Sequence, residues 1–201
     1  QKNNLLEQFK LRCRQEVLVN RGISVRAAKS SSNRNRVAVS ITYKVADEIG
    51  SLGDNISYLR RQISGDEVLQ SLIRTRVIFD TVSAHTRWAS VGAITEPNCH
   101  PVDNKSADHN NGDRAIIHTC LNGDIDNFQE LKQELERGGT KIPKDVTTDT
   151  KIIPLQIEKH VALGHSVEEA FRLAVNDFEG SHAISMHTDL APGKMFLAQK
   201  G

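Results

Sequence analysis

The sequence predicts an α+β fold, a layered domain in which sheets are covered by helices. Helical and strand-like segments follow one another in a mixed order, without the regular strand–helix alternation of a doubly wound parallel sheet. No glycine-rich phosphate-binding loop of either common spacing occurs in the chain. The 201 residues, of which 38 % are apolar, suffice for one domain with a core of its own.

The N-terminal half of the chain carries the weaker periodic patterns. The predicted elements are a helix over 4–20, a polar loop over 29–35 and a strand over 36–44. Asp54 is predicted to cap a short helix, and Asp66 a second one. An apolar run that begins at Val77 predicts a strand leading into His85.

The C-terminal half shows stronger periodicity. Residues 97–114 contain almost no apolar side chain and predict a long loop. After it we expect a strand over 115–121, a helix over 126–137, a helix capped by Asp149, a helix begun by the capping box of Ser166 and Glu169, and strands over 181–187 and 195–199. Because a strand-like run closes the chain, we expect further material beyond both ends.

Charge and cysteine content narrow the class of protein. The chain has 26 basic and 25 acidic residues, so its net charge of +1 produces no long-range field for nucleic acid or an anionic membrane. No apolar run approaches the roughly 20 residues that span a bilayer. The three cysteines, Cys13, Cys99 and Cys120, are too scattered for a zinc ribbon or a disulfide scaffold. We therefore expect a cytoplasmic protein without cofactor, nucleic-acid or membrane partner.

Four polar clusters carry the potential chemistry, and each lies at the end of a predicted element. They are residues 85–92, 96–101, 122–128 and 147–150. Arg87 beside Trp88 can offer a planar fork to a carboxylate, and Asp149 can hold an ammonium group. Asn122 and Gly123 have the form of an oxyanion hole. Taken singly, these features are more often surface packing, a helix cap and a turn.

In their order, the clusters resemble the glutaminase domain of class II glutamine amidotransferases, most of all the glutamine:fructose-6-phosphate amidotransferase branch. That family shows H-T-R-W-A-T-H-G, N-x-H-P, H-N-G-x-x-x-N-(Y/F) and T-D-T. The matching residues here are 85–89 with Gly92, Asn98 with His100 and Pro101, Asn122 and Gly123 with Asn127 and Phe128, and 148–150.

The resemblance implies an Ntn-hydrolase fold, a four-layer αββα sandwich of antiparallel sheets. Residues 1–201 would be one glutaminase domain that lacks its N-terminal nucleophile strand and its last strands. The implied reaction is hydrolysis of glutamine by an N-terminal cysteine. The implied catalytic oxyanion donors are Asn122 and Gly123, and the substrate-binding set is Arg87 for the α-carboxylate, Asp149 for the α-ammonium, and Trp88, Ser90 and His100.

The resemblance also implies partners. Ammonia would pass to a sugar phosphate bound by a second, isomerase-type domain that is not in this chain, and we expect a homo-oligomer. Metal binding by His100, Asp103, Asp108 and His109 is a weaker reading, because their spacing fits no standard site and a solvated loop explains them.

Several positions depart from the family pattern. Cys13 and Cys120 fit core positions and Cys99 merely adjoins His100, so none of them replaces the N-terminal nucleophile. The family's histidines and glutamate are replaced at three places, by Val91, Leu121 and Lys151. These changes leave two alternatives open: an inactive regulatory module that binds glutamine or another amino acid, and an Ntn amidohydrolase with another amide substrate.

Overall fold

The computed structural model describes residues 21–28, 36–46, 53–75, 77, 80–86, 91–107 and 114–201. The chain forms two compact units. The first unit comprises residues 1–79 and 94–99, and the second comprises residues 80–93 and 100–201. The helix predicted over 4–20 and the loop predicted over 29–35 lie outside the described residues.

The first unit contains a two-stranded antiparallel sheet of β1 (Arg21–Ala28) and β2 (Arg36–Tyr43). Their register pairs Arg21 with Tyr43 and Ala28 with Arg36. Its other elements are α2 (Asp54–Ser64), α3 (Glu67–Ile73) and the short 3-10 helix η1 (Glu96–Asn98). The strand predicted over 36–44 is confirmed, whereas β1 was not predicted.

The helix caps of the first unit confirm one prediction and correct another. Asp66 caps α3, because its Oδ1 accepts hydrogen bonds from the amides of Val68 and Leu69 at 3.1 and 3.2 Å. The prediction that Asp54 caps α2 is wrong. Gly53, with φ of 96°, occupies the cap position, and Asp54 is the first residue of the helix.

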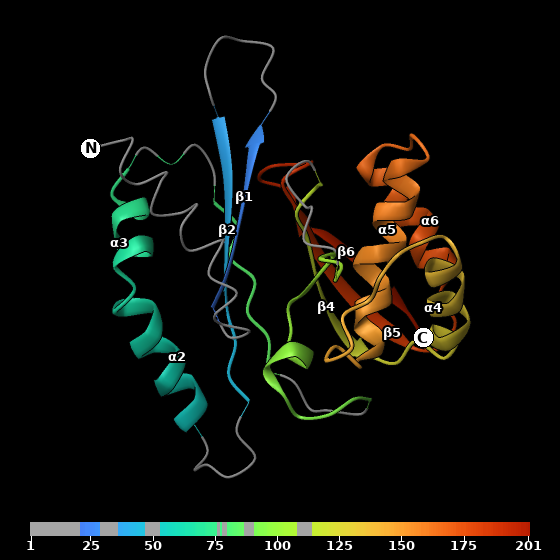
Figure 1. The fold of residues 1–201 in the computed structure, drawn as a ribbon, viewed down its shortest axis with the longest axis horizontal. Coiled ribbons are helices and arrows are strands. Elements are labelled where there is room, and N and C mark those ends of the chain that lie inside the picture. The colour runs from blue at the N-terminus through green and yellow to red at the C-terminus, as the bar shows by residue number, and fades with distance from the viewer. Residues whose placement is uncertain are drawn as a thin grey trace. The chain divides into compact units, whose positions relative to one another are not determined.

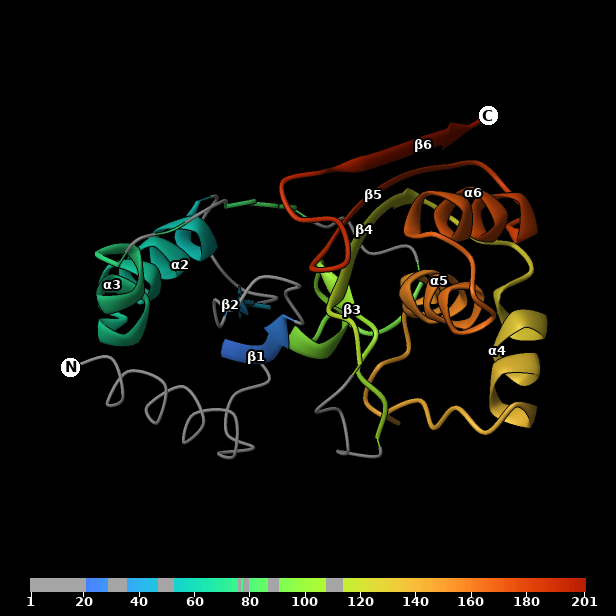
Figure 2. The same ribbon diagram turned by 90° about the horizontal axis from the view of Figure 1, so that it is seen from above.

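The second unit contains a four-stranded antiparallel sheet in the order β3-β4-β5-β6. The strands are β3 (Val102–Asp103), β4 (Ile117–Gly123), β5 (His182–Thr188) and β6 (Phe196–Lys200). Helices α4 (Phe128–Arg137), α5 (Ile152–Ala162) and α6 (Val167–Asp177) cover one face of this sheet (Figure 1, Figure 2). The 3-10 helix η2 (Asp149–Lys151) leads directly into α5.

The core of the second unit lies between the sheet and its helices. Alternate residues of β4 and β5 point into it, because side chains along a strand alternate between its two faces. They are Ile117, Leu121, Ile184 and Met186, and they pack with Leu131, Leu135, Ile153, Ile157, Ala170, Phe171 and Ala174 of the helices. Fully burying one aliphatic side chain of this kind stabilises the fold by about 1.5–3 kcal/mol.

Helices α4 and α6 confirm the predicted periodicity, whereas the first six residues of α5 are all buried. The prediction that Asp149 caps this helix is wrong, because Lys151 occupies the N-cap of α5 and Asp149 begins η2. Ser166 caps α6, since its Oγ accepts a hydrogen bond from the Glu169 amide at 3.2 Å. Pro154 lies in the first turn of α5, where proline costs least. The predicted α+β class is confirmed, and each unit supplies an antiparallel sheet and helices, which are the components of the predicted sandwich.

Two sequence predictions in the middle of the chain are wrong. The described residues 77 and 80–86 belong to no strand, contrary to the strand expected from Val77. The loop predicted over 97–114 includes β3, which pairs Val102 with Thr119. None of the helices in the described ranges has the length and apolar character needed to cross a bilayer.

Candidate functional site

A buried relay of hydrogen bonds connects β4 to η2 through His100. The Leu121 amide donates to His100 Nδ1 at 3.4 Å, and His100 Nε2 lies 2.8 Å from Thr150 Oγ1. Because Nδ1 accepts a hydrogen bond, the network assigns the proton of the neutral ring to Nε2, which donates to Thr150. His100 is 7 % exposed and Thr150 is 1 % exposed, so the relay is shielded from water.

Asp149 stands at the end of this relay and is itself 3 % exposed. Its Oδ2 accepts from the Ile125 amide at 3.0 Å, and its Oδ1 accepts from the Thr150 amide at 2.8 Å and from Thr148 Oγ1 at 3.3 Å. In the described part of the chain, no lysine, arginine or histidine forms an ion pair with this carboxylate. A buried carboxylate without a counter-charge is suited to an ammonium ligand.

The described residues at the two ends of the first predicted cluster, residues 85–92, lie close to the relay. The rings of His85 and His100 lie 4.5 Å apart between centroids. A Cβ on Gly92, whose φ is 87°, would lie 3.1 Å from Thr147 Oγ1 and from the Thr148 amide nitrogen. Arg87, Trp88 and Ser90, between these ends, lie outside the described residues, and their roles stay predictions.

Asn122 and Gly123 are the last two residues of β4, where the sequence predicted a turn after the strand. Asn122 is exposed and lines a cavity of ≈ 480 Å³, together with His85, Cys120 and the facing residues of β5 and β6. Gly123 has φ of 110°, and a Cβ there would collide with the Ser181 carbonyl oxygen. The backbone beside Asn122 therefore lies in close contact with the start of β5.

The structure joins two of the predicted site residues, His100 and Asp149, and ties Asp149 to the loop that follows two others. His100 and Asp149 are joined through Thr150, and the Asp149 carboxylate holds the loop that follows Asn122 and Gly123 through the Ile125 amide. Sequence reasoning missed the threonine hydroxyls and the two amides of the relay. Of these groups, only the threonines could have been identified from the sequence, because they flank the aspartate in the T-D-T string.

Lys151 and Glu158 are two ionisable side chains whose pKa values are shifted by burial and whose polar partners oppose that shift. Lys151, 2 % exposed, lies 3.3 Å from Asp103 Oδ1. Burial lowers the pKa of Lys151 below 10.5, and Asp103 opposes that shift. Glu158 accepts from Asn104 Nδ2 at 2.9 Å. Burial raises the pKa of Glu158, while Arg114 and Asn104 counter this effect.

The cysteines that the structure describes have structural surroundings. Cys120 is buried, as predicted, and its Sγ lies 3.5 Å from Ser83 Oγ. Cys99 donates to the Val45 carbonyl oxygen at 3.4 Å within the first unit. Cys13, Asp108 and His109 lie outside the described residues. Elsewhere in the described ranges, no group of three or more histidine, cysteine or acidic residues is arranged to hold a metal ion.

Comparison with known proteins shows which enzymes the chain is similar to. The chain is homologous to glutamine-dependent aminotransferases, and the predicted resemblance to class II glutamine amidotransferases is confirmed. The relatives are glutamine–fructose-6-phosphate aminotransferases (isomerizing). That of Rhizobium meliloti is 33 % identical over 144 residues, which are 71 % of this chain and 22 % of the relative. That of Sulfurisphaera tokodaii is 40 % identical over 100 residues, which are 50 % of this chain and 15 % of the relative.

The chain thus spans about a fifth or less of the length of the curated relatives it matches. Among solved structures, it is similar to the glutamine phosphoribosylpyrophosphate amidotransferase of B. subtilis. The TM-score is 0.45 and the identity 21 %, over 58 % of this chain and 22 % of that chain. No protein-family model matches the chain.

Proposed function

We propose that the chain is the glutaminase part of a glutamine-dependent amidotransferase. It would hydrolyse the side-chain amide of glutamine to glutamate and ammonia, and the ammonia would be transferred to a sugar phosphate such as fructose 6-phosphate. The observation that carries this proposal is the buried carboxylate of Asp149, which forms no ion pair with any described residue and is tied to the loop that follows Asn122 and Gly123. The sequence relationship to glutamine–fructose-6-phosphate aminotransferases supports the same assignment.

Each proposed role follows from the chemistry of the group. Asp149 neutralises the α-ammonium of glutamine, and the Arg87 guanidinium binds the α-carboxylate as a fork. Trp88, Ser90 and His100 contribute to the wall of the binding site. These contacts fix the amino-acid end of the substrate, so that the side-chain amide reaches the end of β4.

The chemical step begins when an N-terminal cysteine thiolate attacks the amide carbon and forms a C–S bond. The carbonyl electron pair moves to oxygen, where the Asn122 amide and the Gly123 backbone N–H stabilise the negative charge. The cysteine's own α-amino group, acting as the base, gives the thiol proton to the leaving nitrogen, and ammonia departs. Water then hydrolyses the thioester to glutamate and restores the thiol.

The wider context is also part of the proposal. A second, isomerase-type domain of the same protein would bind the sugar phosphate, and the whole enzyme would be a cytoplasmic homo-oligomer. No cofactor is needed for the hydrolytic step, since the thiol, the amino group and the oxyanion donors supply its chemistry.

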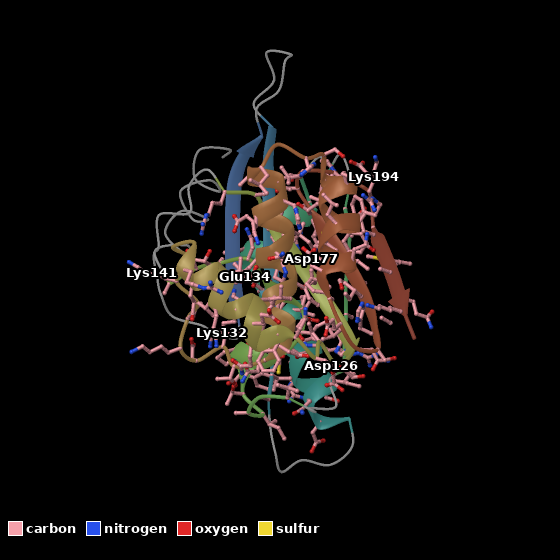
Figure 3. The ribbon with its side chains drawn as sticks, turned by 90° about the vertical axis from the view of Figure 1, so that its right-hand side faces the viewer. Asp126, Lys132, Glu134, Lys141, Asp177 and Lys194 are labelled. Carbon is pink, nitrogen blue, oxygen red and sulfur yellow. The ribbon has the colours of Figure 1, made fainter. Side chains whose placement is uncertain are left out.

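The test is glutamate release by the full-length protein with its native N-terminus. Wild type should hydrolyse glutamine. Arg87→Ala and Asp149→Asn should each lower kcat/KM by roughly 100-fold, since each removes one ionic contact to a charged substrate group. Asp177→Asn is the matched control, because Asp177 pairs with His160 on the helical side of the second unit (Figure 3).

An electrophilic glutamine analogue completes the experiment. Covalent modification of one N-terminal cysteine, detected by intact mass, is the expected result. Calorimetric binding of glutamine without hydrolysis and without an adduct would overturn the enzymatic proposal in favour of an amino-acid-binding regulatory module.

A further inference from the structure

We propose that Lys151 is a positioning residue that sets the affinity for glutamine by clamping the segment after His100 to η2. This inference rests on the proposed function, in which Asp149 binds the α-ammonium of glutamine. Lys151 Nζ donates to the carbonyl oxygens of Asp103 and Lys105 at 2.6 and 2.7 Å, and to Asp103 Oδ1 at 3.3 Å. Its side chain is 3 % exposed.

The three contacts account for every N–H donor of the ammonium group. Two of the three acceptors are backbone carbonyls, so the interaction fixes the path of the main chain over 103–105. The groups that face Lys151 are Asp103, Lys105 and Glu158. Burial lowers the pKa of Lys151, and the two carboxylates oppose this shift. The clamp is thus a fully satisfied buried cation rather than a surface ion pair.

The position of Lys151 in the chain connects this clamp to the site. Lys151 follows Thr150, whose hydroxyl binds His100, and Asp103 lies three residues after His100. Two ties therefore join the same pair of segments, one at each end. Together they fix η2, and with it the carboxylate of Asp149.

The residue type at this position matters. The family pattern has glutamate after T-D-T, but a carboxylate only accepts hydrogen bonds and cannot bind two carbonyl oxygens. The arrangement seen here depends on an ammonium group.

The test compares Lys151→Met with Lys194→Met in the full-length protein. Lys194 is the matched control, because it is an exposed lysine paired with Glu168 at 2.7 Å on the surface (Figure 3). Lys151→Met should raise KM for glutamine about tenfold and change kcat by less than about threefold, because Asp149 grips the end of the substrate remote from the reacting amide. Lys194→Met should leave both constants unchanged.

Active-site titration with an electrophilic glutamine analogue separates positioning from folding. A purely structural role would lower the titratable fraction and leave KM unchanged. Asp103→Asn keeps both carbonyl acceptors and should change KM by less than about twofold. If Asp103→Asn raised KM as much as Lys151→Met does, the ion pair between Lys151 and Asp103 would set the affinity for glutamine. That result would overturn the proposal that the two carbonyl contacts do so.

Should Lys151→Met fail to fold, Lys151→Gln replaces it. This variant keeps two N–H donors, and an increase in KM of about threefold is expected. If wild type hydrolyses glutamine and the folded Lys151 variant has an unchanged KM, this inference alone is overturned. Absence of glutamine hydrolysis by wild type overturns the proposed function, and this inference falls with it.

Discussion

His100 and Thr150 are joined by a hydrogen bond of 2.8 Å between Nε2 and Oγ1, across 50 residues of sequence. Thr150 Oγ1 lies 3.5 Å from Asp149 Oδ1, so the bond continues toward the carboxylate. Through His100 Nδ1, the Leu121 amide enters the same relay. The His100 imidazole and the Thr150 hydroxyl therefore connect Leu121, the residue before Asn122, with Asp149, which we propose binds the ammonium group of the substrate.

Replacement of Thr150 by valine should weaken both stability and substrate binding. Valine keeps the shape of threonine but removes the hydroxyl that His100 Nε2 contacts, and the loss of this buried hydrogen bond costs about 1–3 kcal/mol of unfolding free energy. KM for glutamine should rise several-fold as the carboxylate loses a neighbour. Thr150→Ser, which keeps the hydroxyl, should stay near wild type in urea denaturation and in kinetics. Equal losses in both variants would show that the methyl group matters and the hydroxyl does not.

Asn122→Ala should reduce kcat for glutamine hydrolysis by about 100- to 1000-fold with little change in KM, because an oxyanion donor acts mainly in the transition state. Binding of glutamine, followed by calorimetry on the full-length protein, should be nearly unaffected. A tenfold weaker affinity with unchanged kcat would instead assign Asn122 to ground-state binding.

Gly123→Ala should destabilise the protein by more than about 2 kcal/mol, because a methyl group would collide with the Ser181 carbonyl oxygen at a positive φ. Gly139→Ala is the control. Gly139 also has a positive φ, 91°, but no atom lies within 4 Å of its added Cβ, so the cost should be about 1 kcal/mol. Denaturant midpoints measure the difference, and equal midpoints would contradict the close approach of β4 and β5.

His182 should make the protein sensitive to acid. It is 2 % exposed, and neither ring nitrogen has a hydrogen-bond partner in the described part of the chain. Burial lowers the pKa of His182 below 6.5, Lys200 lowers this pKa further, and Asp126 opposes them. The unfolded chain therefore binds the proton more readily. Stability should be full above pH 6.5 and should fall as the pH drops through and below that value.

The measurement is the denaturation midpoint between pH 8 and 5. His182→Phe should flatten this dependence, whereas His165→Gln, which changes an exposed histidine, should keep the wild-type slope. An unchanged slope in His182→Phe would place the acid sensitivity elsewhere. His187 would be the next candidate, because burial lowers its pKa as well.

The elements that pack on one apolar face could be predicted from the sequence. The helices α4 and α6 follow a clear 3.6-residue period, and Ser166 with Glu169 marks the start of α6. Two strands could not be predicted in this way. β1 alternates Ile23 and Val25 with polar residues but was not recognised, and β3 has only two residues, so its existence depends on pairing with β4.

The site could be predicted only in part. Motif order pointed to Asn122, Gly123, His100 and Asp149, and of these the structure joins His100 and Asp149 through Thr150. The relay could not be foreseen, because it depends on backbone amides and on Thr150, whose neighbours are set by tertiary packing. The role of Lys151 was likewise hidden, since a single lysine in a sequence gives no sign that its partners are carbonyl oxygens.

Leu121 illustrates how the chain can diverge without losing this connection. Its side chain belongs to the apolar cluster with the helices, whereas its contribution to the relay is a main-chain N–H. Any residue except proline provides that donor. Leucine in place of the family's histidine therefore keeps the main-chain link to His100 and adds an apolar side chain to the core.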